Sequence, residues 1–194
     1  LRRAATTAHL AAISAAKAIE QLGYKLSSSA VFDTIEVEAE ASVIEQLALE
    51  REINFYYPSE ERVRIAFDEV TTDEEVNSVV GIFAEAKGRK PKEVKMCKES
   101  AIAVALRRNT PLLAEPVFNR YRSESDLMRY IKRLELRDIS LANSMISLGS
   151  CTMKLNAAAL MQPLSLAGFT NIHPFAPADQ REGYTQLIEE LEHD

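Results

Sequence analysis

The sequence has no tryptophan and contains few cysteines, glycines and prolines for its 194 residues. Its two cysteines, Cys97 and Cys151, stand far apart and form no C-x-x-C pair. We therefore expect neither a disulfide framework nor a cysteine-based zinc site. The cysteine usage fits a reducing compartment. The 6 glycines and 7 prolines are too few for a low-complexity disordered chain.

Long apolar runs are absent as well. No stretch approaches the roughly 20 apolar residues of a membrane-spanning helix, and no secretory signal opens the chain. The net charge of −6 argues against a nucleic-acid partner, whose binding depends on basic residues that neutralise phosphates. The apolar content of 46% is enough for one or two globular domains. Because the chain begins at Leu1 instead of Met, we expect a processed chain or a piece cut from a longer one.

Three helices are predicted in the first 88 residues. The first covers 4–21, ends before Gly23, and carries a stripe at helical spacing formed by Leu10, Ile13, Ala16 and Lys17. Capping-box spacing, with a hydroxyl three residues before a glutamate, opens the other two helices. These pairs are Ser42 with Glu45, before a helix to about Arg51, and Thr72 with Glu75, before the stripe Val76, Val79, Val80 and Phe83.

Two strands lie between these helices. Apolar and polar residues alternate over 31–38 and over 62–67, which is typical of half-buried strands. The order helix, strand, helix, strand, helix predicts a small α/β sandwich with helices packed on a sheet.

The second half of the chain differs in character. A basic stretch at 87–92 starts a region that we interpret as a linker. Beyond it, the sequence predicts helices and loops, with one apolar stripe at Leu127, Tyr130, Ile131 and Leu134. Asp179 and Glu182 have cap spacing before a further stripe at Tyr184, Leu187, Ile188 and Leu191. The basic residues of 120–137 alternate with acidic ones, so a solvated, salt-bridged helix is expected there.

The most informative run is 148–156, which reads Leu-Gly-Ser-Cys-Thr-Met-Lys-Leu-Asn. Glycine makes the backbone approachable, and the neighbouring hydroxyl groups are donors suited to a carboxylate or a phosphate. The spacing differs from that of a Walker A loop. The run therefore indicates either an anion site or an ordinary turn.

This run resembles the signature of the glycine decarboxylase P-proteins of the glycine cleavage system. Further similar segments occur in the family's order at 118–125, 129–134, 138–141, 144–146, 172–177, 180 and 183–184. Residues 116–194 thus carry several motifs in register. The first 115 residues match less closely, with Phe32-Asp33-Thr34 and 51–55 as the best anchors.

The resemblance implies an α/β protein that is part of a fold-type-I PLP-dependent transferase-like enzyme. P-proteins resemble two tandem halves of this type, of which the N-terminal half is an inactive relative. By this resemblance, 1–88 is the small α/β domain that ends the inactive half and 89–115 is a linker. Residues 116–194 then begin the PLP-binding half and include the signature loop.

The implied function is PLP-dependent decarboxylation of glycine, with transfer of the aminomethyl group to the lipoyl arm of the H-protein. The implied cofactor is pyridoxal phosphate, and the implied partners are glycine and a lipoylated H-protein, in a dimer of two-half units. The cytoplasm of a bacterium or the mitochondrial matrix of a eukaryote would be the compartment. No membrane or nucleic-acid partner and no metal is expected. The alternative is a non-catalytic interaction or regulatory module derived from the same scaffold.

The resemblance also places six residues close to the substrate or the cofactor, without assigning individual roles: Gly149, Ser150, Cys151, Thr152, Lys154 and His173. The catalytic residues stay unknown, because the lysine that binds PLP covalently in the family lies beyond this chain. We therefore interpret Lys154 as a solvated or anion-facing ammonium, and we expect the chain alone to be inactive and to hold no PLP covalently.

Other interpretations of single residues stay open. Cys151, His173 and Asp179 form a nucleophilic triad only if they meet in space. His173 either faces a site or is bonded to backbone. His9 and His193 lie in sequence that looks helical and exposed, and we assign them no function. Three positions depart from the family's usual residues: Arg122 in place of His, Leu160 in place of Glu, and Leu166 in place of Trp.

Overall fold

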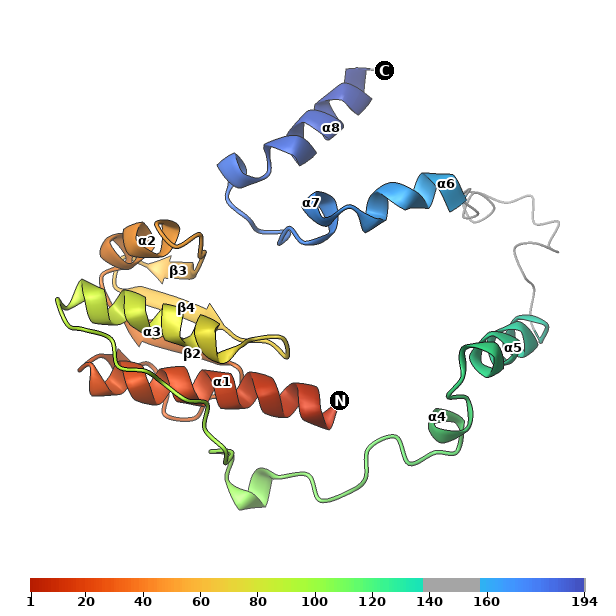
Figure 1. Ribbon diagram of the computed structural model, residues 1–194, viewed down its shortest axis with the longest axis horizontal. Coiled ribbons are helices and arrows are strands. Elements are labelled where there is room, and N and C mark those ends of the chain that lie inside the picture. The colour runs from red at the N-terminus through yellow and green to blue at the C-terminus, as the bar shows by residue number, and fades with distance from the viewer. Residues whose placement is uncertain (138–157, 194) are drawn as a thin grey trace. The chain divides into compact units, whose positions relative to one another are not determined.

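The computed structural model describes residues 1–137 and 158–193 (Figure 1). The chain divides into two compact units, Leu1–Leu112 (unit 1) and Leu113–Asp194 (unit 2). The assignment of 1–88, 89–115 and 116–194 to parts of two enzyme halves stays a prediction.

Unit 1 is built on a four-stranded antiparallel sheet with the strand order β1-β2-β4-β3. The strands are β1 (Lys25–Leu26), β2 (Thr34–Glu38), β3 (Tyr56–Ser59) and β4 (Arg62–Ala66). Both predicted strands are confirmed, with β2 starting three residues later than expected. Two strands were not predicted: β1, which has two residues, and β3, where Pro58 suits only an edge strand.

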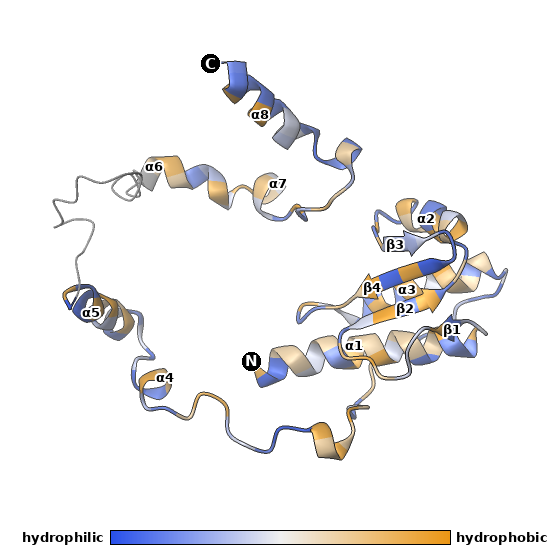
Figure 2. Ribbon diagram, turned by 180° about the vertical axis from the view of Figure 1, so that it is seen from behind, coloured by the Kyte–Doolittle hydropathy of each residue, from blue (hydrophilic) through white to orange (hydrophobic). Residues whose placement is uncertain are grey.

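The two central strands have one apolar and one charged face. Ile35 pairs with Ile65 and Val37 with Val63, and all four side chains are buried. On the other face, Arg62 and Arg64 form ion pairs with Glu36 at 3.1 and 2.6 Å. Figure 2 shows this alternation as blue and orange bands along β4. Because adjacent side chains of a strand point to opposite faces, the period-2 pattern fixes which face the helices cover.

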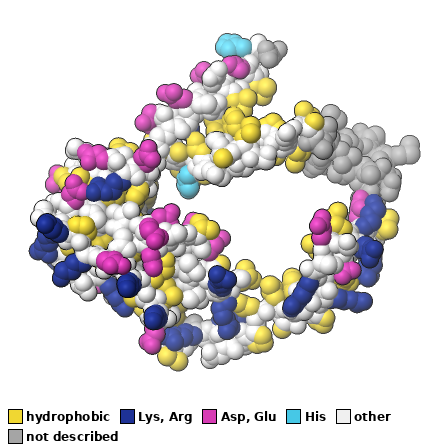
Figure 3. Space-filling view, viewed as in Figure 1, with side chains coloured by type: hydrophobic (Ala, Val, Ile, Leu, Met, Phe, Trp, Pro, Cys, Tyr) yellow, Lys and Arg dark blue, Asp and Glu magenta, His cyan; other side chains and the backbone are white. Residues whose placement is uncertain are grey.

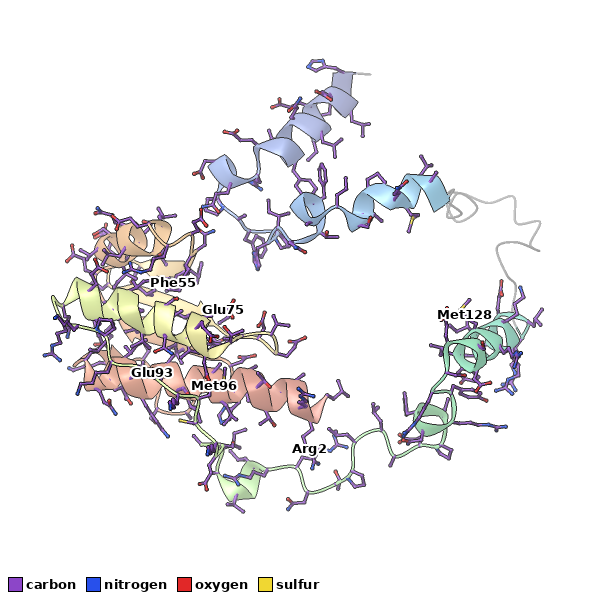
Figure 4. The ribbon with its side chains drawn as sticks, viewed as in Figure 1. Arg2, Phe55, Glu75, Glu93, Met96 and Met128 are labelled. Atoms are coloured by element: carbon purple, nitrogen blue, oxygen red, sulfur yellow. The ribbon has the colours of Figure 1, made fainter. Side chains whose placement is uncertain are left out.

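Three helices of unit 1 supply the rest of the core: α1 (Arg2–Gln21), α2 (Ala41–Leu49) and α3 (Asp73–Ala86). The predicted α3 stripe is confirmed, since Val76, Val79, Val80 and Phe83 are all buried. The ring of Phe83 contacts Phe55 at 6.4 Å and Tyr24 at 5.2 Å between ring centroids (Figure 4 labels Phe55). The predicted mixed α/β class is therefore confirmed for this unit.

The helix termini follow the sequence signals in part. Glu75 N–H donates to Thr72 Oγ1 at 3.2 Å and Thr72 N–H donates to Glu75 Oε2 at 2.7 Å, so this capping box is confirmed. Gly23 has φ of +85°, the left-handed conformation that ends a helix, as predicted.

The capping box predicted at Ser42 and Glu45 is wrong, because α2 begins two residues earlier, with Glu40 at the N-cap and no side-chain hydrogen bond that caps a backbone N–H group. The backbone supplies the partners instead. Ala41 N–H donates to Glu60 O at 2.8 Å and Ala39 N–H donates to Glu61 O at 3.0 Å. The turn between β3 and β4 thus satisfies the start of α2.

The predicted stripe of α1 is only partly correct. Ile13 and Ala16 are buried, but Lys17 is exposed and Leu10 is half-buried. His9, which we predicted to be exposed, is 1% exposed. The reason is that α1 is covered on a second side by the segment 93–101, part of the range predicted as a linker. Cys97 N–H donates to Ser14 Oγ at 2.8 Å and Ala101 N–H donates to His9 Nε2 at 3.1 Å.

Unit 2 contains only helices and loops over the residues that the structure describes. They are α4 (Val117–Arg120), α5 (Glu124–Glu135), α6 (Ala158–Met161), α7 (Ala167–Thr170), α8 (Glu182–His193) and short 3-10 turns at Gln162–Ser165 and Ala178–Gln180. A further 3-10 turn, Val104–Leu106, belongs to unit 1. The helices predicted from the apolar stripes are confirmed as α5 and α8. Asp179 lies inside the second 3-10 turn of this unit, before α8 begins.

The apolar stripes of unit 2 are exposed in the described residues. Leu127 and Ile131 of α5 are 45% and 49% exposed, and Ile188 of α8 is 55% exposed. Figure 3 shows hydrophobic side chains along these helices. No helix within 1–137 or 158–193 is long and apolar enough to cross a membrane.

Candidate functional site

Of the six candidate site residues, the structure describes only His173. Gly149, Ser150, Cys151, Thr152 and Lys154 lie outside the described residues. The described part of the candidate site is the turn that carries His173, together with the helices on either side of it.

This turn is held at its base by an aromatic pair. Tyr184 of α8 donates from its hydroxyl to Phe169 O of α7 at 2.6 Å, and the two rings meet edge to face with centroids 5.3 Å apart. Thr170 Oγ1 donates to Leu166 O at 2.8 Å and so closes the end of α7. The contact between Tyr184 and Phe169 therefore holds together the two ends of the loop 171–181, where it leaves α7 and where it enters α8.

His173 starts a tight turn within this loop. Ala176 N–H donates to His173 O at 2.9 Å, and Phe175 N–H donates to His173 Nδ1 at 3.1 Å. Since Nδ1 accepts a hydrogen bond, the proton of the neutral ring is on Nε2. The expectation that His173 is bonded to backbone is confirmed for Nδ1, and the exposed ring can still donate from Nε2 to a ligand.

Phe175 is the other prominent side chain of the turn, 88% exposed and inclined to the His173 ring at 5.8 Å between centroids. An exposed aromatic ring beside an imidazole donor suits a flat ligand with a polar edge. No hydrogen bond joins His173 to Asp179 in the described part of the chain. Cys151 lies outside it, so the triad stays untested. Among the described residues, no group of three or more His, Cys, Asp or Glu could hold a metal ion.

A cluster of aromatic and arginine side chains, which the sequence did not reveal, fixes the corner between α4 and α5. The rings of Tyr121 and Tyr130 stack at 4.2 Å, and the Arg133 guanidinium lies over both rings at 5.5 and 5.2 Å. Ser123 caps α5 by accepting from Asp126 N–H at 3.2 Å. The sequence did contain a signal for this cluster, because Tyr121 and Tyr130 stand on either side of the helix cap at Ser123.

The salt-bridged character predicted for this helix is confirmed in part. Lys132 pairs with Glu135 at 2.8 Å and Arg129 with Asp126 at 4.0 Å. Arg133 instead donates to the Tyr121 hydroxyl, so its role is to hold the aromatic cluster.

Comparison with known proteins gives the family. Residues 1–83 match the family model described as glycine cleavage system P-protein. A "Glycine dehydrogenase (decarboxylating)" of Christiangramia forsetii is 48% identical over 190 residues, which is 97% of this chain. The protein of the same name from Flavobacterium johnsoniae is 45% identical over 99% of this chain, and the mitochondrial one from Mus musculus is 38% identical over the whole of this chain.

The chain belongs to the glycine cleavage system P-protein family.

The chain spans about a fifth of the length of these P-protein relatives: 20% of the two bacterial proteins and 19% of the mouse protein. The family model matches residues 1–83, where we found the weaker motifs.

Two of the three departures from the usual P-protein residues are exposed apolar side chains. Leu160 is 72% exposed and Leu166 is 55% exposed. Arg122 donates to Asn119 Oδ1 at 2.8 Å and so joins α4 to the loop before α5. Nothing in the structure explains why these three positions differ from the family.

Proposed function

We propose that this chain is part of a PLP-dependent glycine decarboxylase, which releases CO2 from glycine and passes the aminomethyl group to the lipoyl arm of an H-protein. The observation that carries the proposal is the 48% identity over 97% of the chain to a protein named glycine dehydrogenase (decarboxylating). Because the chain spans a fifth of that relative, the activity is proposed for the complete enzyme.

The residues that the structure describes fit one edge of a site for PLP. The exposed Phe175 ring and the Nε2–H of His173 suit a flat heteroaromatic ring with anionic substituents. By the resemblance to the family, the lysine that binds the cofactor lies in another part of the complete enzyme and is not Lys154. We therefore expect the chain alone to hold no PLP covalently.

The signature loop would supply the polar side of the same site. Gly149 lets the backbone approach a ligand, and the hydroxyl groups of Ser150 and Thr152 can donate to a carboxylate. PLP, when bound, supplies the electron sink for decarboxylation. The part of this chain is to orient glycine, to place Lys154 and Cys151 near its anionic group, and to exclude water.

We further propose the architecture of the complete enzyme. Residues 1–88 would end the inactive half of a fold-type-I transferase pair, 89–115 would be a linker, and 116–194 would begin the PLP-binding half. The lipoylated H-protein would be the partner, and two such units would form a dimer. The bacterial relatives, and a mouse relative named as mitochondrial, support a bacterial cytoplasm or a mitochondrial matrix.

A chimeric enzyme tests the proposal. The matching 190-residue region of the Christiangramia forsetii protein is replaced by this chain, and glycine-dependent CO2 exchange is measured with a lipoylated H-protein. We expect exchange within an order of magnitude of the parent enzyme. A chimera that folds and binds PLP but shows no exchange would overturn the proposal for this chain.

The chain alone provides the control. After incubation with PLP and borohydride reduction, peptide mapping should find no stoichiometric adduct. An adduct on Lys154 would contradict our assignment of that residue.

The second candidate function is a non-catalytic interaction or regulatory module on the same scaffold, and the three departures at Arg122, Leu160 and Leu166 favour it. Restoring the usual family residues in the chimera (Arg122→His, Leu160→Glu and Leu166→Trp) separates the two. If only the restored chimera is active, this chain is better interpreted as a non-catalytic interaction or regulatory module.

A further inference from the structure

A basic groove lies on unit 1, where the last turns of α1 meet the segment 89–97. Its volume is about 520 Å³, and five cationic side chains line it: Lys17, Arg89, Lys90, Lys92 and Lys95. Figure 3 shows Lys and Arg side chains along the edge of unit 1 where α1 and α3 end. Ligand sites commonly have volumes of about 300 to 1,000 Å³.

The charge of the groove is opposite to that of the chain. Glu93 is its only acidic lining residue, whereas the whole chain has a net charge of −6. Lys90, Lys92 and Lys95 are exposed, and their ammonium groups have no protein partner in the described part of the chain. Unpaired like charges around a concavity repel one another, and an anionic ligand would relieve that repulsion.

The segment at the groove is held by α3 at Val94 and Met96 and by α1 at its end, where Cys97 N–H donates to Ser14 Oγ at 2.8 Å. Val94 N–H donates to Asn77 Oδ1 at 2.7 Å, and Val94 O accepts from Asn77 Nδ2 at 2.8 Å. Met96 N–H donates to Asp73 Oδ1 at 3.2 Å, and both apolar side chains pack against the core (Figure 4 labels Glu93 and Met96).

Two alternate residues of this segment, before Cys97, are open on the side of the groove. Glu93 and Lys95 line the groove, and their backbone N–H and C=O groups have no hydrogen-bond partner within residues 1–137 and 158–193. An extended segment that is anchored through every second residue presents its remaining backbone groups as a strand edge does. Such an edge can pair with a second extended chain.

We infer that the basic groove binds an extended acidic peptide segment of a partner protein, by backbone pairing at Glu93 and Lys95 and by ion pairs with the surrounding lysines. The cations are spread along the segment from residue 89 to residue 95, which suits carboxylates spaced along a chain. A compact phosphate site would gather its donors at one point. The inference does not depend on the proposed glycine decarboxylation.

Fluorescence anisotropy with the full chain tests this. The probe is a labelled ten-residue peptide of alternating glutamate and threonine, and the reference peptide has glutamine in place of glutamate. We expect saturable binding of the glutamate peptide, at least tenfold weaker binding of the glutamine peptide, and slower exchange of the Lys95 amide in the complex.

Two double variants with the same charge change separate the groove from general electrostatics. Lys92→Glu with Lys95→Glu should weaken binding at least tenfold. Arg2→Glu with Arg3→Glu, at the opposite end of α1, should change it less than twofold. Circular dichroism confirms the fold of each variant. Equal losses in both variants, absence of binding, or inorganic triphosphate binding as tightly as the peptide would each overturn the inference.

Discussion

At the scale of single residues, His9 connects three parts of unit 1. Its Nδ1 lies 2.8 Å from Phe32 O, and its Nε2 accepts from Ala101 N–H at 3.1 Å. A carbonyl oxygen can only accept, so the ring is neutral with its proton on Nδ1. The Phe32 ring stacks on it at 5.7 Å. A histidine that looked unassigned in the sequence therefore has a structural role.

His9→Ala should lower the free energy of unfolding by about 1 to 3 kcal/mol, because it leaves two polar backbone groups without partners. Urea denaturation measures this loss, and hydrogen exchange should show faster exchange at Ala101. His173→Ala is the matched control, since that ring is exposed, and should change stability by less than about 0.5 kcal/mol. Equal effects of the two substitutions would contradict the role of His9.

Glu36 makes a pH-dependent contribution on the exposed face of the sheet. Hydrogen bonding from Arg64, followed by that from Ser27, holds the pKa of the Glu36 carboxyl below its usual value. A carboxyl with a lowered pKa in the folded state stabilises the fold above its unfolded pKa, and this contribution is lost as the pH falls through the folded pKa.

Glu36→Gln should therefore reduce the loss of melting temperature between neutral pH and the acid side of pH 4. Melting curves across this range measure it, with Glu38→Gln on the same strand as a control. An unchanged acid slope in the Glu36 variant would show that the ion pairs with Arg62 and Arg64 contribute nothing to stability.

At the scale of elements, two sequence signatures with the same capping-box spacing behave differently. Thr72 and Glu75 form a complete capping box, whereas Ser42 donates only to the Glu40 carboxylate at 3.3 Å. The difference arises because the turn between β3 and β4 reaches the start of α2, whereas no such turn within 1–137 or 158–193 donates to or accepts from the start of α3.

Thr72→Ala should cost about 1 kcal/mol, the usual loss for removing an N-cap side chain. Ser42→Ala should cost much less, since its hydroxyl caps no helix N–H group. Chemical denaturation of the two variants side by side gives both numbers. A larger loss for Ser42 than for Thr72 would reverse our interpretation of the two helix starts.

At the scale of the whole molecule, the buried apolar residues are concentrated in unit 1. Every buried hydrophobic residue of the described chain lies between Ala8 and Ala84. Within its described residues, unit 2 has exposed apolar helix faces and no buried core. Cooperative unfolding is therefore expected to come from unit 1.

Residues 1–112 produced alone should keep the melting temperature of the full chain, as measured by circular dichroism. A fall of more than about 4 °C, near 1 kcal/mol for a domain of this size, would show that unit 2 stabilises unit 1. Separate production of unit 2 completes the comparison, and we expect it to show no cooperative transition.

The signature loop gives a prediction for the complete enzyme. Thr152→Val in the chimera should lower glycine-dependent CO2 exchange roughly a hundredfold, or about 3 kcal/mol, if its hydroxyl binds a group that gains charge in the transition state. A hydroxyl that only holds a turn would instead cost about 1 kcal/mol of stability. Normal exchange with a lowered melting temperature would remove Thr152 and Ser150 from the site.

The sequence alone was sufficient for features that depend on neighbours in the chain. Helix periodicity located α1, α3, α5 and α8, alternation located β2 and β4, and the capping box located the start of α3, because each signal lies within one or two turns or along one strand. The motifs from 116 onward led to the P-protein family for the same reason, since each is a short local run.

Only the tertiary structure decided the features that depend on distant residues. The burial of His9 depends on Ala101, 92 positions away, and the groove depends on residues 89–97 lying beside the end of α1. The start of α2 depends on a turn formed twenty residues later, and the edge strands β1 and β3 are too short for a pattern. Hydrogen bonds and packing between distant segments determine these features, and periodicity within one segment does not contain that information.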